Sequence, residues 1–417
     1  MFSQSILYLI LQLFNIIIGL FINIYLAQKL KPEVFSVLAI YSIIIALFTT
    51  FTYMGYEQVL IRNVLNWQEQ NKKFWIKLNI TYAIITRLIM SIIILPFVVG
   101  YAYYMDIINY GHKYFLYFLA FALSGIFFAL IDSLGLILKS FNEYVKFFVI
   151  SKLSNIVIRL LSIVIFINMG FNSFLVALTF LPLIVFVFAF YEVKEFIDYK
   201  LLNLRLLLKF KKYKYFIYTN YLNYLKINFD QLMVSLFVKP EILGMFNFCK
   251  RIEELGRNTI EGFFDPIIQK SVAFKSKVSD LANYINKIFK IQKIVLSLAI
   301  VTLIILYIYV DKLILLLKLS HFQYLNKNLL FVSVFLSLYI VYKIKSDLIY
   351  IFEEQVKIFQ LDLLTNILNL IFTISFIYFV SQNYIYFYRI INGVVILVMF
   401  FHYYNKKFNI YNKMRVI

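Results

Sequence analysis

The chain has 417 residues, of which 63% are hydrophobic, 20% are aromatic and only 15% are charged. This composition, with a mean hydropathy of +0.83, excludes an ordinary soluble globular protein and predicts an integral membrane protein. The formal net charge of +20 would suggest nucleic acid as the partner of a soluble protein. Here most lysines and arginines fall in loops between apolar runs, so we expect no nucleic-acid partner.

About a dozen apolar runs follow one another, each near the roughly 20 residues that a helix needs to cross lipid. In the first half we expect spans over residues 2–26, 34–61, 78–99, 114–138, 147–168 and 173–191. In the second half we expect spans over residues 215–237, 241–266, 294–310, 328–342, 361–380 and 384–404. Lys343, Lys345 and Asp347 interrupt the tenth run. The predicted fold class is all-α, a polytopic membrane protein with twelve transmembrane helices.

Charge placement predicts the orientation of these spans. Lysines and arginines concentrate in alternate connections, and the positive-inside rule places those connections in the cytoplasm. Both termini then lie in the cytoplasm as well. The basic connection 195–214 separates two sets of six spans, so we expect an N-lobe of residues 1–194 and a C-lobe of residues 215–417.

Two similar segments, residues 30–39 and 238–247, occupy the same place in each half and contain the same Lys-Pro-Glu tripeptide. Proline suits the first turn of a helix because no N–H is needed there, and the following glutamate favours the positive end of the helix dipole. Matched corners of this kind predict an internal duplication. Since six spans separate them, the lobes would be parallel repeats related by a pseudo-twofold along the membrane normal, a transporter architecture with its site between the lobes.

The residues around these corners also resemble a known family. Segments 25–33 (YLAQKLKPE), 35–37 (FSV) and 55–62 (GYEQVLIR) resemble the opening of polysaccharide repeat-unit flippases, in the multidrug/oligosaccharidyl-lipid/polysaccharide exporter superfamily. Segments 228–232 (NFDQL) and 236–244 resemble the seventh helix of that family and its following corner. The chain departs from the family at Lys31 and Lys239, where glycine is frequent.

The resemblance implies a function and its partners. It implies a flippase of the bacterial inner membrane that moves undecaprenyl-diphosphate-linked oligosaccharide to the outer leaflet by alternating access, during O-antigen or capsule assembly. The implied partners are this substrate, membrane lipid, and a polysaccharide polymerase with other assembly proteins. The protein would not be an enzyme and would need no cofactor.

Basic residues inside the predicted spans are the candidates for substrate binding. An ionised side chain at mid-bilayer costs roughly 2.5 to 3.5 kcal/mol on insertion scales, so each needs a wet interior or a partner. A diphosphate would be attracted by a cationic cavity, in which arginine pairs bidentately and lysine acts as a point charge. The candidates for this cavity are Arg251, Arg257, Lys250, Arg159 and Lys226.

Several carboxylates lie near these cations in the sequence. Lys250, Glu254, Arg257 and Glu261 are spaced four, three and four residues apart, so they share one helix face. The alternative to a cavity lining is that the charges on this helix neutralise one another. Asp230 lies four residues after Lys226, which is consistent with a structural ion pair or with a cation or proton site that couples transport.

The remaining intramembrane charges lie nearer the ends of spans or on an outer helix. Asp132 is expected to partner one of the arginines. Glu57 and Arg62 are expected at the cytoplasmic mouth, either as first contacts for a head group or as interfacial charges. Arg87 is a weaker cavity candidate, because third helices tend to be peripheral in this architecture, and Arg389 is expected to snorkel to the outer surface.

Other functions are less well supported by the sequence. No catalytic residues, metal ligands or nucleotide motif are predicted: the three histidines lack metal spacing, and the single cysteine, Cys249, excludes an intrachain disulfide. A cation-coupled multidrug exporter of the same superfamily would predict a cavity dominated by carboxylates. A membrane polysaccharide polymerase would need a sizeable external loop, and the longest one expected is 311–327.

Overall fold

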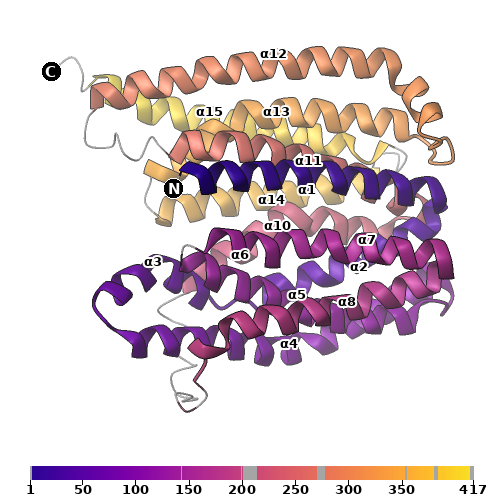
Figure 1. Cartoon of the computed structure of the whole chain (residues 1–417). Coiled ribbons are helices and arrows are strands. Elements are labelled where there is room, and N and C mark those ends of the chain that lie inside the picture. Colours follow the sequence, from indigo (N-terminus) through magenta and orange to yellow (C-terminus); the bar gives the residue numbers. More distant parts are fainter. Residues whose placement is uncertain are drawn as a thin grey trace. The chain divides into compact units, whose positions relative to one another are not determined.

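The computed structural model describes residues 2–141, 143–198, 200, 214–269, 278–352, 355–379 and 384–413. Within these ranges every regular element is a helix, which confirms the predicted all-α class (Figure 1). The helices of the first half are α1 (Phe2–Lys29), α2 (Pro32–Phe51), α3 (Tyr56–Glu69), α4 (Lys73–Tyr110), α5 (Phe115–Ser140), α6 (Tyr144–Phe148), α7 (Ser154–Met169) and α8 (Phe171–Val193). A π-helical turn, η1 (Val149–Leu153), joins α6 to α7, and a 3-10 turn, η2 (Lys194–Phe196), follows α8.

In the described part of the second half there are six long helices, and Figure 1 shows α12 alongside α13. They are α10 (Lys214–Phe237), α11 (Pro240–Gln269), α12 (Val278–Leu316), α13 (Leu325–Phe352), α14 (Gln355–Phe379) and α15 (Phe387–Lys413). Among the described residues, eight helices are long and apolar enough to cross a membrane, and segments Ile17–Lys29 and Phe387–Tyr403 are shorter apolar helices. Each predicted span overlaps a helix, so the chain is a polytopic membrane protein.

Both Lys-Pro-Glu corners form as predicted. Helices α2 and α11 begin at Pro32 and Pro240, and Glu33 and Glu241 lie in their first turns. The prolines lose no hydrogen bond at these positions, and the carboxylates lie at the positive ends of the helix dipoles. The local chemistry of each corner therefore determines where its helix starts.

Three predicted boundaries are wrong. The second span does not continue to residue 61: α2 ends at Phe51, and α3 starts at Tyr56 after Gly55, whose φ of 82° is a left-handed conformation that glycine adopts without steric cost. The tenth span is not interrupted, because Lys343 and Asp347 pair one turn apart at 2.9 Å and α13 continues through them. The external loop predicted at 311–327 is shorter, since α12 extends to Leu316 and α13 begins at Leu325.

The chain forms two compact units. The first consists of Met1–Ile22 and Val37–Leu236, and the second of Asn23–Ser36 and Phe237–Ile417. The core of the first unit includes Leu60, Ile80 and Leu134 from α3, α4 and α5. The core of the second includes Phe264 and Ile344 from α11 and α13. The lobes expected at 1–194 and 215–417 stay a prediction.

Candidate functional site

A buried arginine of α4, Arg87, is the centre of a charge cluster in the first unit. Its side chain is 1% exposed. Its Nε donates to Glu57 Oε1 at 2.9 Å, and its Nη2 donates to Asp132 Oδ2 at 3.2 Å. Ser133 Oγ also donates to Glu57, which is itself buried. We call Glu57, Arg87 and Asp132 the α4 cluster; it joins α3, α4 and α5 through ionised side chains.

Arg87 also holds the break between α2 and α3. Its Nη1 donates to the carbonyl of Thr49 at 2.6 Å and to the hydroxyl of Thr52 at 3.1 Å. The last carbonyls of a helix lack partners within the helix and carry the negative end of its dipole. Glu57 lies in the first turn of α3, at the positive end. The Arg87–Glu57 pair therefore stabilises the end of one helix and the start of the next.

A second cluster, in the second unit, is organised around Glu253 of α11, whose side chain is fully buried. Arg257 Nη1 donates to Glu253 Oε1 at 3.4 Å. Arg389 Nε lies 3.2 Å from Oε2 of the same carboxylate, and the Tyr386 hydroxyl donates to Oε2 at 2.7 Å. One carboxylate thus connects α11 to α15.

Arg257 is enclosed on its other side by Glu261 and Tyr339. Its Nη2 lies 3.9 Å from Glu261 Oε1, and its guanidinium lies 5.3 Å from the centre of the Tyr339 ring. The Tyr339 hydroxyl donates to the same Glu261 oxygen. Arg257 is therefore neutralised by carboxylates of its own helix. We call Glu253, Arg257, Glu261 and Arg389, with their two tyrosines, the α11 cluster.

Holding helices together through buried ion clusters such as these two has a free-energy cost. Desolvation of buried ions is not fully repaid by their attraction, and apolar replacement of a whole buried ion pair is often neutral or stabilising. Ionised groups inside membrane spans are accordingly rare and mark functional regions. The clusters on α4 and α11 thus point to function or conformational selection more than to stability.

The two Lys-Pro-Glu corners lie in direct backbone contact within the second unit. A Cβ at Gly244, one turn into α11, would lie 2.0 Å from the carbonyl oxygen of Pro32, so the absence of a side chain permits the contact. The rings of Phe35, Phe248 and Phe322 pack beside it with centroids 5.9 to 6.3 Å apart. We call this contact the corner junction.

The other predicted site residues are spread over several helices. Lys250 of α11 is fully buried, and its neighbours Arg251 and Glu254 are half-buried. Arg159 of α7 is half-buried. Asp230 of α10 is buried, and its Oδ1 accepts the backbone N–H of Gln231 at 2.8 Å.

Two predicted residues, Arg62 and Lys226, have side chains that lie outside the described part of the chain. The expected Lys226–Asp230 pair therefore stays a prediction, as does the contact of Arg62 with a head group.

Pairing across helices accounts for the differences from the sequence-based expectations. Arg389 does not snorkel: its side chain is 3% exposed and faces Glu253. Arg87, expected to be peripheral, is buried, and Asp132 partners an arginine as expected. Neutralisation of Arg257 by Glu253 agrees with the alternative that charges on this helix neutralise one another, whereas the pairing of Glu253 with Arg389 was not predicted.

A buried polar stripe on α14 was also missed. Asp362, Asn366, Asn369 and Thr373 are spaced four, three and four residues apart and share a buried helix face. Asn392 of α15 donates to the Asn369 side chain. Among the residues that the structure describes, no group of three or more His, Cys, Asp or Glu side chains is arranged to hold a metal ion.

Comparison with solved structures identifies the fold. The chain is similar to a multidrug resistance MATE family transporter of the MOP superfamily in an inward-facing conformation, with a TM-score of 0.69 and 14% identity over 95% of this chain and 98% of that one. It is similar to the lipid II flippase MurJ in an inward closed conformation, with a TM-score of 0.69 and 17% identity over 95% and 86%. A MOP superfamily transporter from Pyrococcus furiosus gives a TM-score of 0.62 and 16% identity over 96% and 95%. These identities establish the fold alone.

Comparison at the level of sequence gives the family. The search of curated proteins finds no match. Residues 25–323 match the family model described as polysaccharide biosynthesis protein, and this range includes both Lys-Pro-Glu corners, the α4 cluster and all of α11 and α12. Since the match covers well over half of the chain, the protein belongs to the polysaccharide biosynthesis protein family.

Proposed function

We propose that this protein is a flippase that moves undecaprenyl-diphosphate-linked oligosaccharide repeat units across the bacterial inner membrane by alternating access. The observation that carries the proposal is the polysaccharide biosynthesis match over residues 25–323, on a fold shared with a lipid II flippase. A polysaccharide precursor linked to a lipid has a polar head group that cannot cross the hydrocarbon core unaided. A polytopic helical protein of this family is suited to supply that passage.

The substrate diphosphate requires cations that can reach it. We assign this role to Arg251, Arg257, Lys250, Arg159 and Lys226. In the described conformation Arg257 lies between Glu253 and Glu261, so a phosphate would have to replace these carboxylates. Exchange of one anionic partner for another costs less than exposure of an unpaired buried cation. A buried ion cluster beside a substrate path can therefore act as a switch.

The remaining assignments concern coupling, orientation and partners. Asp230, Glu254 and Asp132 are the candidates for coupling to an ion gradient or for ion pairing. Arg62 is the proposed contact at the cytoplasmic mouth, because Glu57 is buried against Arg87. Both termini would lie in the cytoplasm, and a polysaccharide polymerase with other assembly proteins would receive the product.

A multidrug exporter is the second candidate, because a MATE transporter matches the fold as well as the lipid II flippase does, with TM-scores of 0.69 for both. The family match favours the flippase. The third alternative, a polymerase, loses support because the connection between α12 and α13 is shorter than expected.

Reconstitution separates the two transport functions. The full chain in proteoliposomes should move labelled undecaprenyl-diphosphate oligosaccharide from one leaflet to the other, measured by its accessibility to an added glycosidase, while a lipophilic cationic dye should not be transported. Protein-free liposomes control for spontaneous flipping. Transport of the dye without movement of the lipid would establish the exporter instead.

A further inference from the structure

The first turns of α12 carry a basic face that the proposed transport mechanism does not use. Lys287, Lys290 and Lys293 are spaced three residues apart and are exposed. Like charges at this spacing repel one another and destabilise the helix. From Asn283 to Val310 the helix contains no aspartate or glutamate that could offset them. The basic face is therefore suited to an anion from outside the helix.

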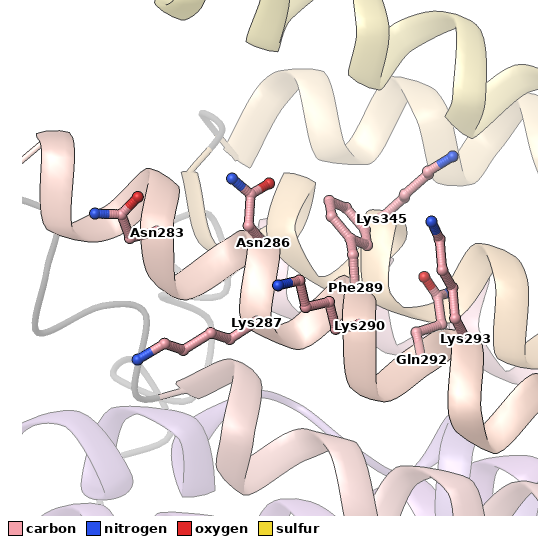
Figure 2. Close-up of a pocket in the computed structure, with 8 residues that line it drawn as sticks. All are labelled: Asn283, Asn286, Lys287, Phe289, Lys290, Gln292, Lys293 and Lys345. Atoms are coloured by element: carbon pink, nitrogen blue, oxygen red, sulfur yellow. The ribbon is translucent and has the colours of Figure 1, made fainter.

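This basic face lines a pocket within the second unit. The pocket has a volume of about 880 Å³, which is in the range of small-molecule sites. Its lining consists of Asn283, Asn286, Lys287, Phe289, Lys290, Gln292 and Lys293 of α12 with Lys345 of α13 (Figure 2). In the view of Figure 2, the Phe289 ring lies between the ammonium of Lys290 and those of Lys293 and Lys345. Among the lining residues that the structure describes there are four ammonium groups and three amides but no carboxylate.

The inner wall of the pocket is fixed by contacts between helices. The Gln292 side chain donates to the backbone carbonyls of Ile340 and Val341 at 2.7 and 2.9 Å, which anchors α12 to α13. Lys345 is almost fully buried, and its ammonium lies 3.2 Å from the centre of the Phe401 ring on α15. The pocket is thus bounded by α12 and α13, and one of its lysines, Lys345, is held in place by an aromatic ring of α15.

Directly after Lys293 the exposed face of α12 changes from basic to apolar. Ile294, Leu298, Val301, Ile305 and Ile308 are all more than half exposed. In a membrane protein, exposed apolar side chains of this size face lipid tails. The pocket therefore adjoins the end of a lipid-facing stripe, at the depth where phosphate head groups lie. At ~1.5 Å per residue, the three lysines before Ile294 extend roughly 10 Å along the helix beyond the end of this stripe.

We propose that this pocket binds the phosphate head group of an anionic phospholipid, whose acyl chains lie along the exposed apolar stripe of α12. The lysines bind the phosphate by charge-assisted hydrogen bonds, and the amides of Asn283 and Asn286 can donate to the head group's other oxygens. This inference concerns a resident lipid and does not depend on the transported substrate. A soluble phosphate would satisfy the lysines but would make no use of the apolar stripe.

The experiment compares two lysine triples in the purified full chain in detergent. Binding of dioleoylphosphatidylglycerol, dioleoylphosphatidylcholine and glycerol phosphate is measured by native mass spectrometry for the wild type, for K287Q/K290Q/K293Q and for K72Q/K73Q/K77Q. The second triple removes the same charge from another segment predicted to be cytoplasmic. Of the six lysines replaced in the two triples, five are exposed and Lys77 is half-buried, so both variants should keep the wild-type melting temperature.

We expect phosphatidylglycerol to bind more tightly than phosphatidylcholine and glycerol phosphate to bind only weakly. The α12 triple should weaken phosphatidylglycerol binding roughly 100-fold, at about fivefold per lysine, and the control triple less than about fivefold. Equal losses in the two triples would show general charge attraction and overturn the site. Equal binding of the two phospholipids, or binding of glycerol phosphate as tight as that of phosphatidylglycerol, would overturn the assignment of an anionic lipid.

Discussion

Replacing Arg87 with methionine should destabilise the first unit by about 3 to 5 kcal/mol, because the substitution leaves the Glu57 carboxylate buried without its cation. It also removes the donor to the Thr49 carbonyl and the Thr52 hydroxyl, so the end of α2 loses its stabilising positive charge. The expected result is a large fall in the melting temperature of the protein in detergent, measured by differential scanning fluorimetry, with low yield of monodisperse protein.

Two further substitutions in the α4 cluster serve as controls. Asp132→Asn should cost less than about 1 kcal/mol, because the Asp132 side chain is 44% exposed and water can replace its partner. The double variant Arg87→Met/Glu57→Gln should recover a substantial part of the stability lost by Arg87→Met alone, since it removes the unpaired charge. If Arg87→Met melts at the same temperature as Asp132→Asn, the α4 cluster does not hold the helices together as described.

Replacing Gly244 with alanine should force the corner junction apart. The new methyl would lie 2.0 Å from the carbonyl oxygen of Pro32 and 2.8 Å from its carbonyl carbon. These are backbone atoms and cannot rotate away, so we expect destabilisation at or above the 1 to 3 kcal/mol usual for overpacking. The measurement is again the melting temperature, together with the activity of the reconstituted protein.

Two other glycines provide matched controls for this substitution. Gly100→Ala meets no atom within 4 Å and should leave stability equal or slightly higher, because alanine is the better helix former. In Gly256→Ala the nearest atoms to the new methyl belong to the flexible side chain of Leu336, so the effect should be intermediate. A Gly244→Ala protein that is as stable and active as Gly100→Ala would show that the two corners do not touch.

The sequence predicts the elements of this fold well because hydropathy and helix-start chemistry are local. The Lys-Pro-Glu corners combine proline at the first turn with an acidic second residue, and both helices begin there. The break at Gly55 was missed because an apolar run that contains a glycine has the same composition whether the helix continues through the glycine or ends before it.

The candidate site could be predicted only in part, because the partners of buried charges come from other helices. The Arg257–Glu253 pair is visible as a spacing of four residues. By contrast, Arg389 and Glu253 are separated by 136 positions, and Arg87 and Glu57 by 30, so no periodicity connects them. Hydropathy tells which residues enter the membrane but not which face of a helix meets which neighbour.

The proposal that this protein flips a lipid-linked repeat unit is most directly tested by following that repeat unit in a strain from which the protein has been deleted. The account predicts that the repeat unit accumulates in the inner leaflet and surface polysaccharide is lost. The wild-type chain should restore both, whereas Arg251→Ala and Arg257→Ala at equal membrane levels should restore them poorly. Normal surface polysaccharide and no accumulated repeat unit in the deletion strain would contradict the proposed function, and full restoration by both arginine variants would contradict the cationic site.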